Sequence, residues 1–307
     1  MTTPDPDLAA ALAVLTNAIQ NPPKAPVDLG PLEPRLDALA ARVDDLAAPA
    51  PVLITVAPSG DTIGQVDGAR HPQLETLLRA VSARDAAGYR LNVWLAGPAG
   101  SGKTHAAKQV ASALDLEFGF HGSMSMPHEL LGFVDAGGTY QETVFVRLFQ
   151  SGGVCLLDEI DAGSDEARLA INAGLANGLL SLPDGRIVER HPDFIAIGAA
   201  NTWGGGATAD YVGRAKIDAA TLSRFPVKLS WDYDCDLEKQ ICGNPSWAEY
   251  VHAARDRARA AGLKHQIDPR HSMAGAALVA AGFSFEQAAD MTFLAGLNDT
   301  QRDMVTA

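Results

Sequence analysis

The sequence predicts an α/β protein: a doubly wound parallel sheet, preceded by a helical extension and followed by a small all-helical lid domain. Three observations support this fold class. Short apolar strands alternate with helical stretches through the middle of the chain, a glycine-rich loop joins one strand to the next helix, and the strands stop after about residue 232. Such alternation is typical of a parallel sheet covered by helices on both faces. We therefore divide the chain into residues 1–50, 51–232 and 233–307.

The composition limits the class of protein. Of the 307 residues, 47% are hydrophobic, and the formal net charge of −13 argues against a protein that coats duplex DNA. No apolar run reaches the roughly 18 residues of a membrane span. The first seven residues carry two aspartates and no Lys or Arg, unlike a secretory signal, and three cysteines cannot form a disulfide framework. We expect a cytoplasmic protein without a membrane partner.

The N-terminal extension differs in composition from the rest. The first 58 residues hold ten of the 18 prolines, and the first aromatic residue is Tyr89. Apolar residues nevertheless recur at helical spacing, with a short heptad pattern from Leu29 to Leu46. Three interpretations stay open here: amphipathic helices that lie on the main body, a coiled coil or docking helix for self-assembly or a partner, and disorder.

The core elements are expected in the following order. A hairpin over residues 52–66 precedes a helix over Leu74–Ala87, whose apolar residues fall on one face. Helices then begin near Lys103, Pro127, Ser164 and Asp218. The predicted strands are Asn92–Ala96, Leu116–Phe120, Val154–Leu157, Phe194–Ala199 and Val227–Leu229. The helices expected in the C-terminal domain are Ser246–Ala261, His271–Ala281 and Phe285–Leu297.

A glycine-rich loop follows the first core strand and opens a helix. Its sequence fits the phosphate-binding pattern G-x-x-x-x-G-K-[ST], in which backbone N–H groups line a concave anion site. Lys103 would reach the outer phosphates, and the Thr104 hydroxyl would ligate Mg²⁺. The loop residues are Gly97, Pro98, Ala99, Gly100, Ser101, Gly102, Lys103 and Thr104.

Polar residues end two later strands. Asp158 follows an apolar strand and can hold Mg²⁺ from the side opposite Thr104. The adjacent Glu159 can act as the base that polarises the attacking water. The alternative is an exposed acidic turn, because Asp161 follows closely. Asn201, at the end of the next strand, can orient the water that faces the γ-phosphate.

Two arginines are candidates for transition-state stabilisation. Phosphoryl transfer needs positive charge on the oxygens of the transferred group. Arg224 follows Leu222-Ser223, and Arg270 follows Asp268-Pro269. An arginine supplied by a neighbouring subunit would make hydrolysis depend on assembly. The alternative for each is a surface salt bridge.

These residues, in this order, resemble the AAA+ ATPases and, within them, the MoxR-like branch. From Gly178 on, the sequence is most similar to the subgroup of the cobaltochelatase small subunit, the Rubisco- and nitric-oxide-reductase-activating ATPases and related phage-encoded ATPases. The resemblance covers roughly residues 65–281. The stretches that carry it are Asn177-Gly178, Leu182–Gly185, Arg190–Phe194, Ala200–Thr202 and Ile217–Phe225.

The resemblance implies an AAA+ P-loop core, with ATP and Mg²⁺ as cofactors. Residues 97–104 then correspond to Walker A, and Asp158 and Glu159 to Walker B, with Glu159 as the catalytic base. Asn201 corresponds to sensor 1. His71 lies where the family encloses the adenine; a backbone or stacking contact there competes with a plain turn at the start of a helix.

The resemblance also implies a homo-oligomeric ring, expected to be a hexamer, with ATP between subunits. Arg224 corresponds to the arginine finger that acts on the next subunit's ATP, and Arg270 to sensor 2 of the helical lid. Arg214 is a second candidate for action in trans. Residues 124–143 and 179–189 correspond to insertions that face the central pore or the partner.

The function that we expect is an ATPase that couples hydrolysis to remodelling of a protein client, in this branch often with a von Willebrand A domain. Two alternatives stay open. One is a DNA-directed motor or loader, as in phage replication or restriction, although the acidic charge does not favour direct nucleic-acid contact. The other is a nucleotide-dependent assembly scaffold. DNA-stimulated hydrolysis would favour the motor, and an intact, functional Glu159→Gln ring would favour the scaffold.

Overall fold

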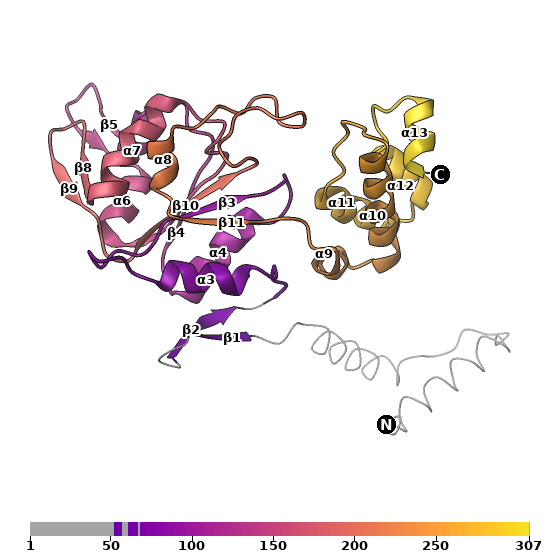
Figure 1. Cartoon of the computed structure of the whole chain (residues 1–307), viewed down its shortest axis with the longest axis horizontal. Coiled ribbons are helices and arrows are strands. Elements are labelled where there is room, and N and C mark those ends of the chain that lie inside the picture. Colours follow the sequence, from indigo (N-terminus) through magenta and orange to yellow (C-terminus); the bar gives the residue numbers. More distant parts are fainter. Residues whose placement is uncertain (1–51, 57–60, 67, 307) are drawn as a thin grey trace, which may run out of the picture. The chain divides into compact units, whose positions relative to one another are not determined.

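The computed structural model in Figure 1 describes residues 52–56, 61–66 and 68–306. The described residues all belong to the second of the chain's two units, residues 50–307. The helical extension predicted for residues 1–50, with its heptad pattern, lies outside the described residues.

A five-stranded parallel sheet forms the core of this unit. The strand order is β11-β3-β10-β7-β4, and every neighbouring pair is parallel. The five strands confirm the predicted ones, with ends shifted by a residue or two. They are β3 (Val93–Ala96), β4 (Phe118–His121), β7 (Gly153–Leu157), β10 (Phe194–Ala200) and β11 (Val227–Ser230).

Helices cover both faces of the sheet, as a doubly wound fold requires (Figure 1). Alternate residues of the three central strands, β3, β10 and β7, enter two separate hydrophobic clusters, because side chains alternate between the faces of a strand. One cluster includes the apolar side chains of α3 (Leu74–Ser82) and α4 (Lys103–Ala113). The other includes those of α5 (His128–Leu131), α6 (Val144–Ser151) and α7 (Asp165–Asn177).

Helix α3 is shorter than predicted. The expectation was a helix to Ala87, but α3 ends at Ser82. Arg84 instead forms an isolated antiparallel bridge with Arg90, and the Asp85 carboxylate accepts hydrogen bonds from the backbone of the turn that follows. This local turn replaces the last helical residues.

Three small antiparallel hairpins flank the sheet. The predicted leading hairpin is β1 (Val52–Val56) with β2 (Asp61–Val66). The 124–143 segment contains α5 and a hairpin of β5 (Phe133–Val134) and β6 (Tyr140–Gln141). The 179–189 segment forms the predicted hairpin of β8 (Leu179–Ser181) and β9 (Ile187–Glu189).

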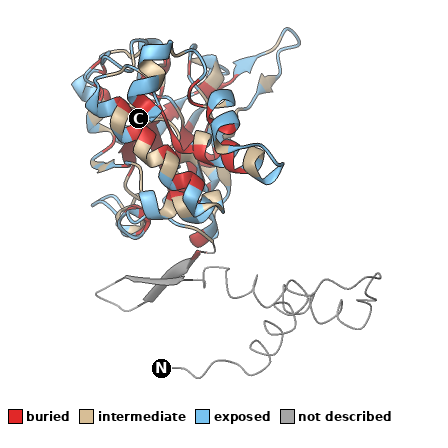
Figure 2. Ribbon diagram, turned by 90° about the vertical axis from the view of Figure 1, so that its right-hand side faces the viewer, coloured by how far each residue is buried: buried red, intermediate tan, exposed pale blue. Residues whose placement is uncertain are grey.

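Only helices follow β11 among the described residues, which confirms the predicted all-helical domain. A third hydrophobic cluster includes Trp247 and Phe293. Buried residues gather in the interior of the described part of the chain, and exposed residues cover its surface (Figure 2). Two of these helices were not expected, α9 and α13, and α12 ends before its predicted limit at Leu297. The helices are α9 (Cys235–Cys242), α10 (Pro245–Ala260), α11 (Pro269–Ala280), α12 (Phe285–Met291) and α13 (Asp299–Thr306). A search of the described residues finds no helix long and apolar enough to cross a membrane.

Candidate active site

The phosphate loop connects β3 to α4 and needs glycine at three positions. Gly100 and Gly102 have φ of +77° and +88°, the left-handed region that favours glycine. A Cβ on Gly97 would lie 2.0 Å from the carbonyl oxygen of Trp231. The Ser101 hydroxyl is buried without a hydrogen-bond partner among the described residues. A buried, unpaired hydroxyl in a loop of this geometry fits a phosphate ligand.

Lys103 lies at the start of α4 and is almost fully buried. Its Nζ donates to two backbone carbonyls of the phosphate loop, at 2.7 and 2.9 Å, and to Oδ1 of Asn201 at 3.3 Å. Burial lowers the pKa of Lys103 to about 8, although two nearby aspartates favour the charged form. The amine is therefore held among oxygen acceptors, ready to exchange them for phosphate oxygens.

Thr104 and Asp158 meet at the carboxyl edge of the sheet. The Thr104 hydroxyl donates to Oδ2 of Asp158 at 3.3 Å, and the backbone N–H of Glu159 donates to Oδ1 at 3.0 Å. A hydroxyl and a carboxylate are hard oxygen ligands of the kind that Mg²⁺ prefers. These two residues would hold a Mg²⁺ ion, which would offset phosphate charge.

Glu159 has an unusual backbone conformation. Its φ of +50° is one of two positive values among the described non-glycine residues. Such a conformation costs on the order of 1–3 kcal/mol and is retained only where the surroundings impose it. The side chain is 53% exposed, and its Oε1 lies 3.5 Å from a guanidinium nitrogen of Arg214. The carboxylate is thus open to solvent and to a water nucleophile.

Asp161 is fully buried, so the alternative of an exposed acidic turn does not hold for this residue. Its Oδ2 accepts hydrogen bonds from the backbone N–H groups of Asn201 (3.1 Å) and Thr202 (3.0 Å) and from the Thr202 hydroxyl (3.0 Å). Oδ1 lies 3.4 Å from Arg214. Asp161 therefore fixes the position of Asn201 relative to the end of β7.

Arg214 lies inside the site of its own chain. Sequence reasoning made it a candidate for action on a neighbouring subunit, but here its guanidinium contacts both Glu159 and Asp161. The same loop contributes Tyr211, whose hydroxyl accepts a hydrogen bond from the N–H of Ala99 at 3.1 Å. Neither contact was visible in the sequence, because both join segments far apart in the chain.

The phosphate loop is also held from the lid side. The Tyr233 hydroxyl donates to the carbonyl of Ala99 at 2.7 Å, and burial raises the pKa of Tyr233 to about 12, so it remains a donor. The Asp268 carboxylate lies close to Gly100, 3.1 Å from where a Cβ would stand. Arg270, next to Asp268 in the first turn of α11, is 69% exposed and forms a long ion pair with it at 3.8 Å.

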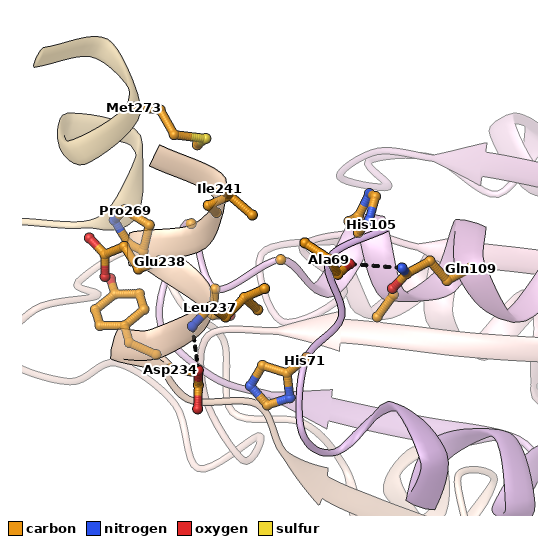
Figure 3. Close-up of a pocket in the computed structure, with 15 residues that line it drawn as sticks. Ala69, His71, His105, Gln109, Asp234, Leu237, Glu238, Ile241, Pro269 and Met273 are labelled. Carbon is orange, nitrogen blue, oxygen red and sulfur yellow. Dashed lines mark hydrogen bonds between the residues drawn. The ribbon is translucent and has the colours of Figure 1, made fainter. Parts of the chain in front are cut away.

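A cavity of about 320 Å³ opens beside the phosphate loop, between α4 and the lid (Figure 3). A volume of this order is typical of small-ligand sites. His71 lies in its lining, stacked on Trp231 with ring centroids 4.2 Å apart. Its Nδ1 accepts from the N–H of Gln73, so Nε2 donates to the carbonyl of Asp232. His71 is thus fixed at the cavity as expected, and apolar lid residues Leu237, Ile241 and Met273 line the other side.

Arg224 is the one predicted site residue that lies apart from the others. Its carbonyl accepts a hydrogen bond from the side chain of Asn92, which immediately precedes β3. The phosphate loop follows the other end of the same strand. The structure thus gathers Lys103, Thr104, Asp158, Glu159 and Asn201 at one edge of the sheet and leaves Arg224 at the opposite edge.

Comparison with known proteins agrees with this geometry. Residues 92–225 match the family model of the AAA domain, dynein-related subfamily. The match begins just before β3 and ends just after Arg224, so it includes the phosphate loop, both acidic residues and Asn201. Among curated proteins, none matches the chain.

One solved structure shares this fold with a TM-score that reaches 0.50. A point mutant of RuvB from Thermotoga maritima has a TM-score of 0.50 and 17% identity, over 77% of this chain and 76% of that chain. A second RuvB mutant from the same organism has a TM-score of 0.49 and 17% identity, over 76% and 74%. A closed state of Hsp104 has a TM-score of 0.43 and 17% identity, over 55% and 34%. The first likeness shows the fold, and the predicted AAA+ architecture is confirmed.

Proposed function

We propose that this chain is an ATP hydrolase that assembles into a homo-oligomeric ring, expected to be hexameric, and remodels a protein client, as in the MoxR-like branch. One observation carries the proposal. The groups that bind a nucleotide and activate water converge at one edge of the sheet, while Arg224 lies at the other edge. An incomplete site of this kind supports catalysis at a subunit interface.

Each residue of the site has a role that its contacts support. The loop N–H groups and Lys103 bind the phosphates, and Thr104 and Asp158 hold Mg²⁺, which would offset phosphate charge when bound. Glu159 accepts the proton of the attacking water. Asn201 orients that water, since its backbone is fixed by a buried carboxylate.

The position of Arg224 supports action in trans. β3 has four residues, so the two edges of the sheet lie roughly 13 Å apart along it, at about 3.3 Å per residue. An arginine whose backbone is tied to the amino end of β3 is poorly placed to reach phosphates bound beyond its carboxyl end. A neighbouring subunit can present its phosphates to this arginine, which supports the ring.

The β5–β6 and β8–β9 hairpins support a protein client. They touch each other, because the Arg186 guanidinium lies over the Tyr140 ring at 4.9 Å. Both display large apolar side chains that are exposed to solvent, which is typical of interaction surfaces. These side chains are Phe133, Val134, Leu179 and Ile187.

The proposal is tested by steady-state ATP hydrolysis with the oligomer mass recorded in parallel. Wild type should turn over ATP as a ring, and Glu159→Gln should bind ATP but turn over at least about 100-fold more slowly. Near-wild-type turnover by Glu159→Gln would contradict the assigned base. Stimulation by single- or double-stranded DNA would contradict the protein-client assignment. An intact ring without turnover would contradict the hydrolase itself.

A further inference from the structure

Two buried polar side chains lie at the amino edge of the sheet, outside the site described above. Asn92 precedes β3 and is 3% exposed, and Arg190 follows β9 directly and is 6% exposed. Buried groups of this polarity need partners, because an unpaired buried donor or acceptor is costly. Arg190 bonds to Asn92, and Asn92 bonds to Arg224.

Arg190 fixes the side chain of Asn92. One guanidinium nitrogen of Arg190 donates to Oδ1 of Asn92 at 3.0 Å, and also to the backbone carbonyls of Arg90 (2.8 Å) and Phe194 (3.0 Å). Oδ1 of Asn92 accepts a second hydrogen bond from the N–H of Ala196 at 3.2 Å. With its oxygen held by two donors, the amide of Asn92 has one orientation.

That orientation directs the amide nitrogen of Asn92 at Arg224. Nδ2 donates to the carbonyl of Arg224 at 3.0 Å. The Arg224 side chain lacks an equivalent anchor, since its Nε is buried without a hydrogen-bond partner among the described residues. All three residues line one polar cavity of about 170 Å³. The location of Arg224 therefore depends on its backbone, whose N–H donates to the carbonyl of Thr221 and whose carbonyl accepts from Asn92.

We infer that Asn92 and Arg190 are positioning residues for Arg224, and that they act on the ATP bound by the neighbouring subunit. The inference rests on the proposed function, in which Arg224 acts in trans. Arg190 also closes the base of the β8–β9 hairpin, where its N–H donates to the carbonyl of Gly178 at 2.8 Å. Arg190 thus holds the hairpin proposed to face the client through its backbone, and the proposed arginine finger through its side chain and Asn92.

The test uses Asn92→Asp, which is isosteric. It keeps the oxygen that Arg190 and Ala196 bind, and it replaces the donor to Arg224 by an oxygen that faces a carbonyl. We expect kcat to fall on the order of 10- to 100-fold, because small misplacement of a catalytic group costs up to about 100-fold. The affinity for ATP, measured in a Glu159→Gln background, should change less than about twofold, because the phosphate loop lies at the other end of β3.

Mixed rings separate a positioning role from a structural one. Asn92→Asp subunits have an intact phosphate site, and Glu159→Gln subunits have an intact arginine at the opposite edge. An equimolar mixture should turn over ATP several-fold faster than the two preparations measured separately. The matched control is Arg224→Ala mixed with Glu159→Gln, which should show the same recovery. A general folding defect in Asn92→Asp would not be relieved by mixing.

Two results would overturn the inference while leaving the proposed function standing. One is wild-type kcat in Asn92→Asp. The other is a loss of kcat in Asn92→Asp that mixing with Glu159→Gln subunits does not restore, although the same mixing restores turnover to Arg224→Ala. Failure of the Arg224→Ala control, or no turnover by wild type, would overturn the proposed function and the inference with it. If Asn92→Asp does not bind ATP, Arg190→Lys, which keeps the charge, takes its place in the same comparison.

Discussion

Raising the pH from 7 to 9 is expected to weaken ATP binding about tenfold, because it removes the proton from Lys103. Burial lowers the pKa of this lysine from 10.5 to about 8 in the nucleotide-free protein. Phosphate oxygens would favour the charged ammonium, so binding returns the pKa toward its ordinary value. ATP therefore binds to the form with a protonated Lys103, and the fraction of protein in that form falls as the pH rises above 8.

The magnitude follows from the two pKa values. With a pKa of about 8, the protonated fraction falls from about 0.9 at pH 7 to about 0.1 at pH 9, which corresponds to about 1.4 kcal/mol of binding free energy. The effect of rising pH on folding stability has the opposite sign to its effect on ATP binding. The unfolded chain holds its proton up to pH 10.5, so burial of the charge costs about 3 kcal/mol below pH 8. That penalty disappears between pH 8 and 10.5, and the nucleotide-free fold gains stability from Lys103 as the pH rises.

The assay is calorimetric titration of Glu159→Gln with Mg-ATP at pH 7, 8 and 9, in two buffers of different ionisation enthalpy. Proton uptake on binding should rise from about 0.1 per ATP at pH 7 to about 0.9 at pH 9. Lys103→Met, added to the same background, should bind weakly and lose this pH dependence. A dissociation constant that is the same at pH 7 and pH 9, or an equal pH dependence in Lys103→Met, would refute the reasoning.

Three further predictions follow. Asp161→Asn should lower the free energy of unfolding in urea by about 3 kcal/mol, because it leaves the partly buried Arg214 without its fully buried carboxylate partner. An unchanged denaturation midpoint would contradict the buried network. Gly275→Ala places a Cβ 2.0 Å from a buried tryptophan ring of the lid and should lower the melting temperature, whereas Gly205→Ala, whose Cβ meets nothing within 4 Å, should not. Arg270→Ala should lower ATP turnover at least tenfold and leave unfolding within about 0.5 kcal/mol, because its one ion pair is long and exposed; a large loss of stability with normal turnover would remove Arg270 from the site.

Local patterns made the sheet and the phosphate site predictable. The three central strands, β3, β7 and β10, are short runs of buried residues. The phosphate loop is specified by a strand, glycines and a helix within a few residues. The acidic pair and Asn201 each follow such a strand, and parallel strands bring their carboxyl ends to one edge. Sequence alone therefore placed Lys103, Thr104, Asp158, Glu159 and Asn201 correctly together.

What sequence reasoning missed depends on contacts between distant segments. The apolar residues Leu237 and Ile241 of α9 line the cavity, and the buried residue of this helix is Glu238, whose charge is balanced by Arg255 on α10. Asp161 is buried because loop N–H groups at the end of β10 bind it. Arg214 lies beside Glu159 because the loop after β10 returns to its own site. No local periodicity or spacing signals any of these three contacts.

The most direct test of the account is ATP turnover in a mixture of two variants, Glu159→Gln and Arg224→Ala. Each alone should be nearly inactive, one for lack of the base and the other for lack of the arginine. An interface is complete where the phosphate site of an Arg224→Ala subunit faces the arginine of a Glu159→Gln subunit. Random mixing in a closed ring gives this arrangement at about a quarter of the interfaces. Recovery near that level is the predicted result. A mixture that exchanges subunits yet stays as inactive as its components, or full activity in Arg224→Ala alone, would contradict a site completed by the neighbouring subunit.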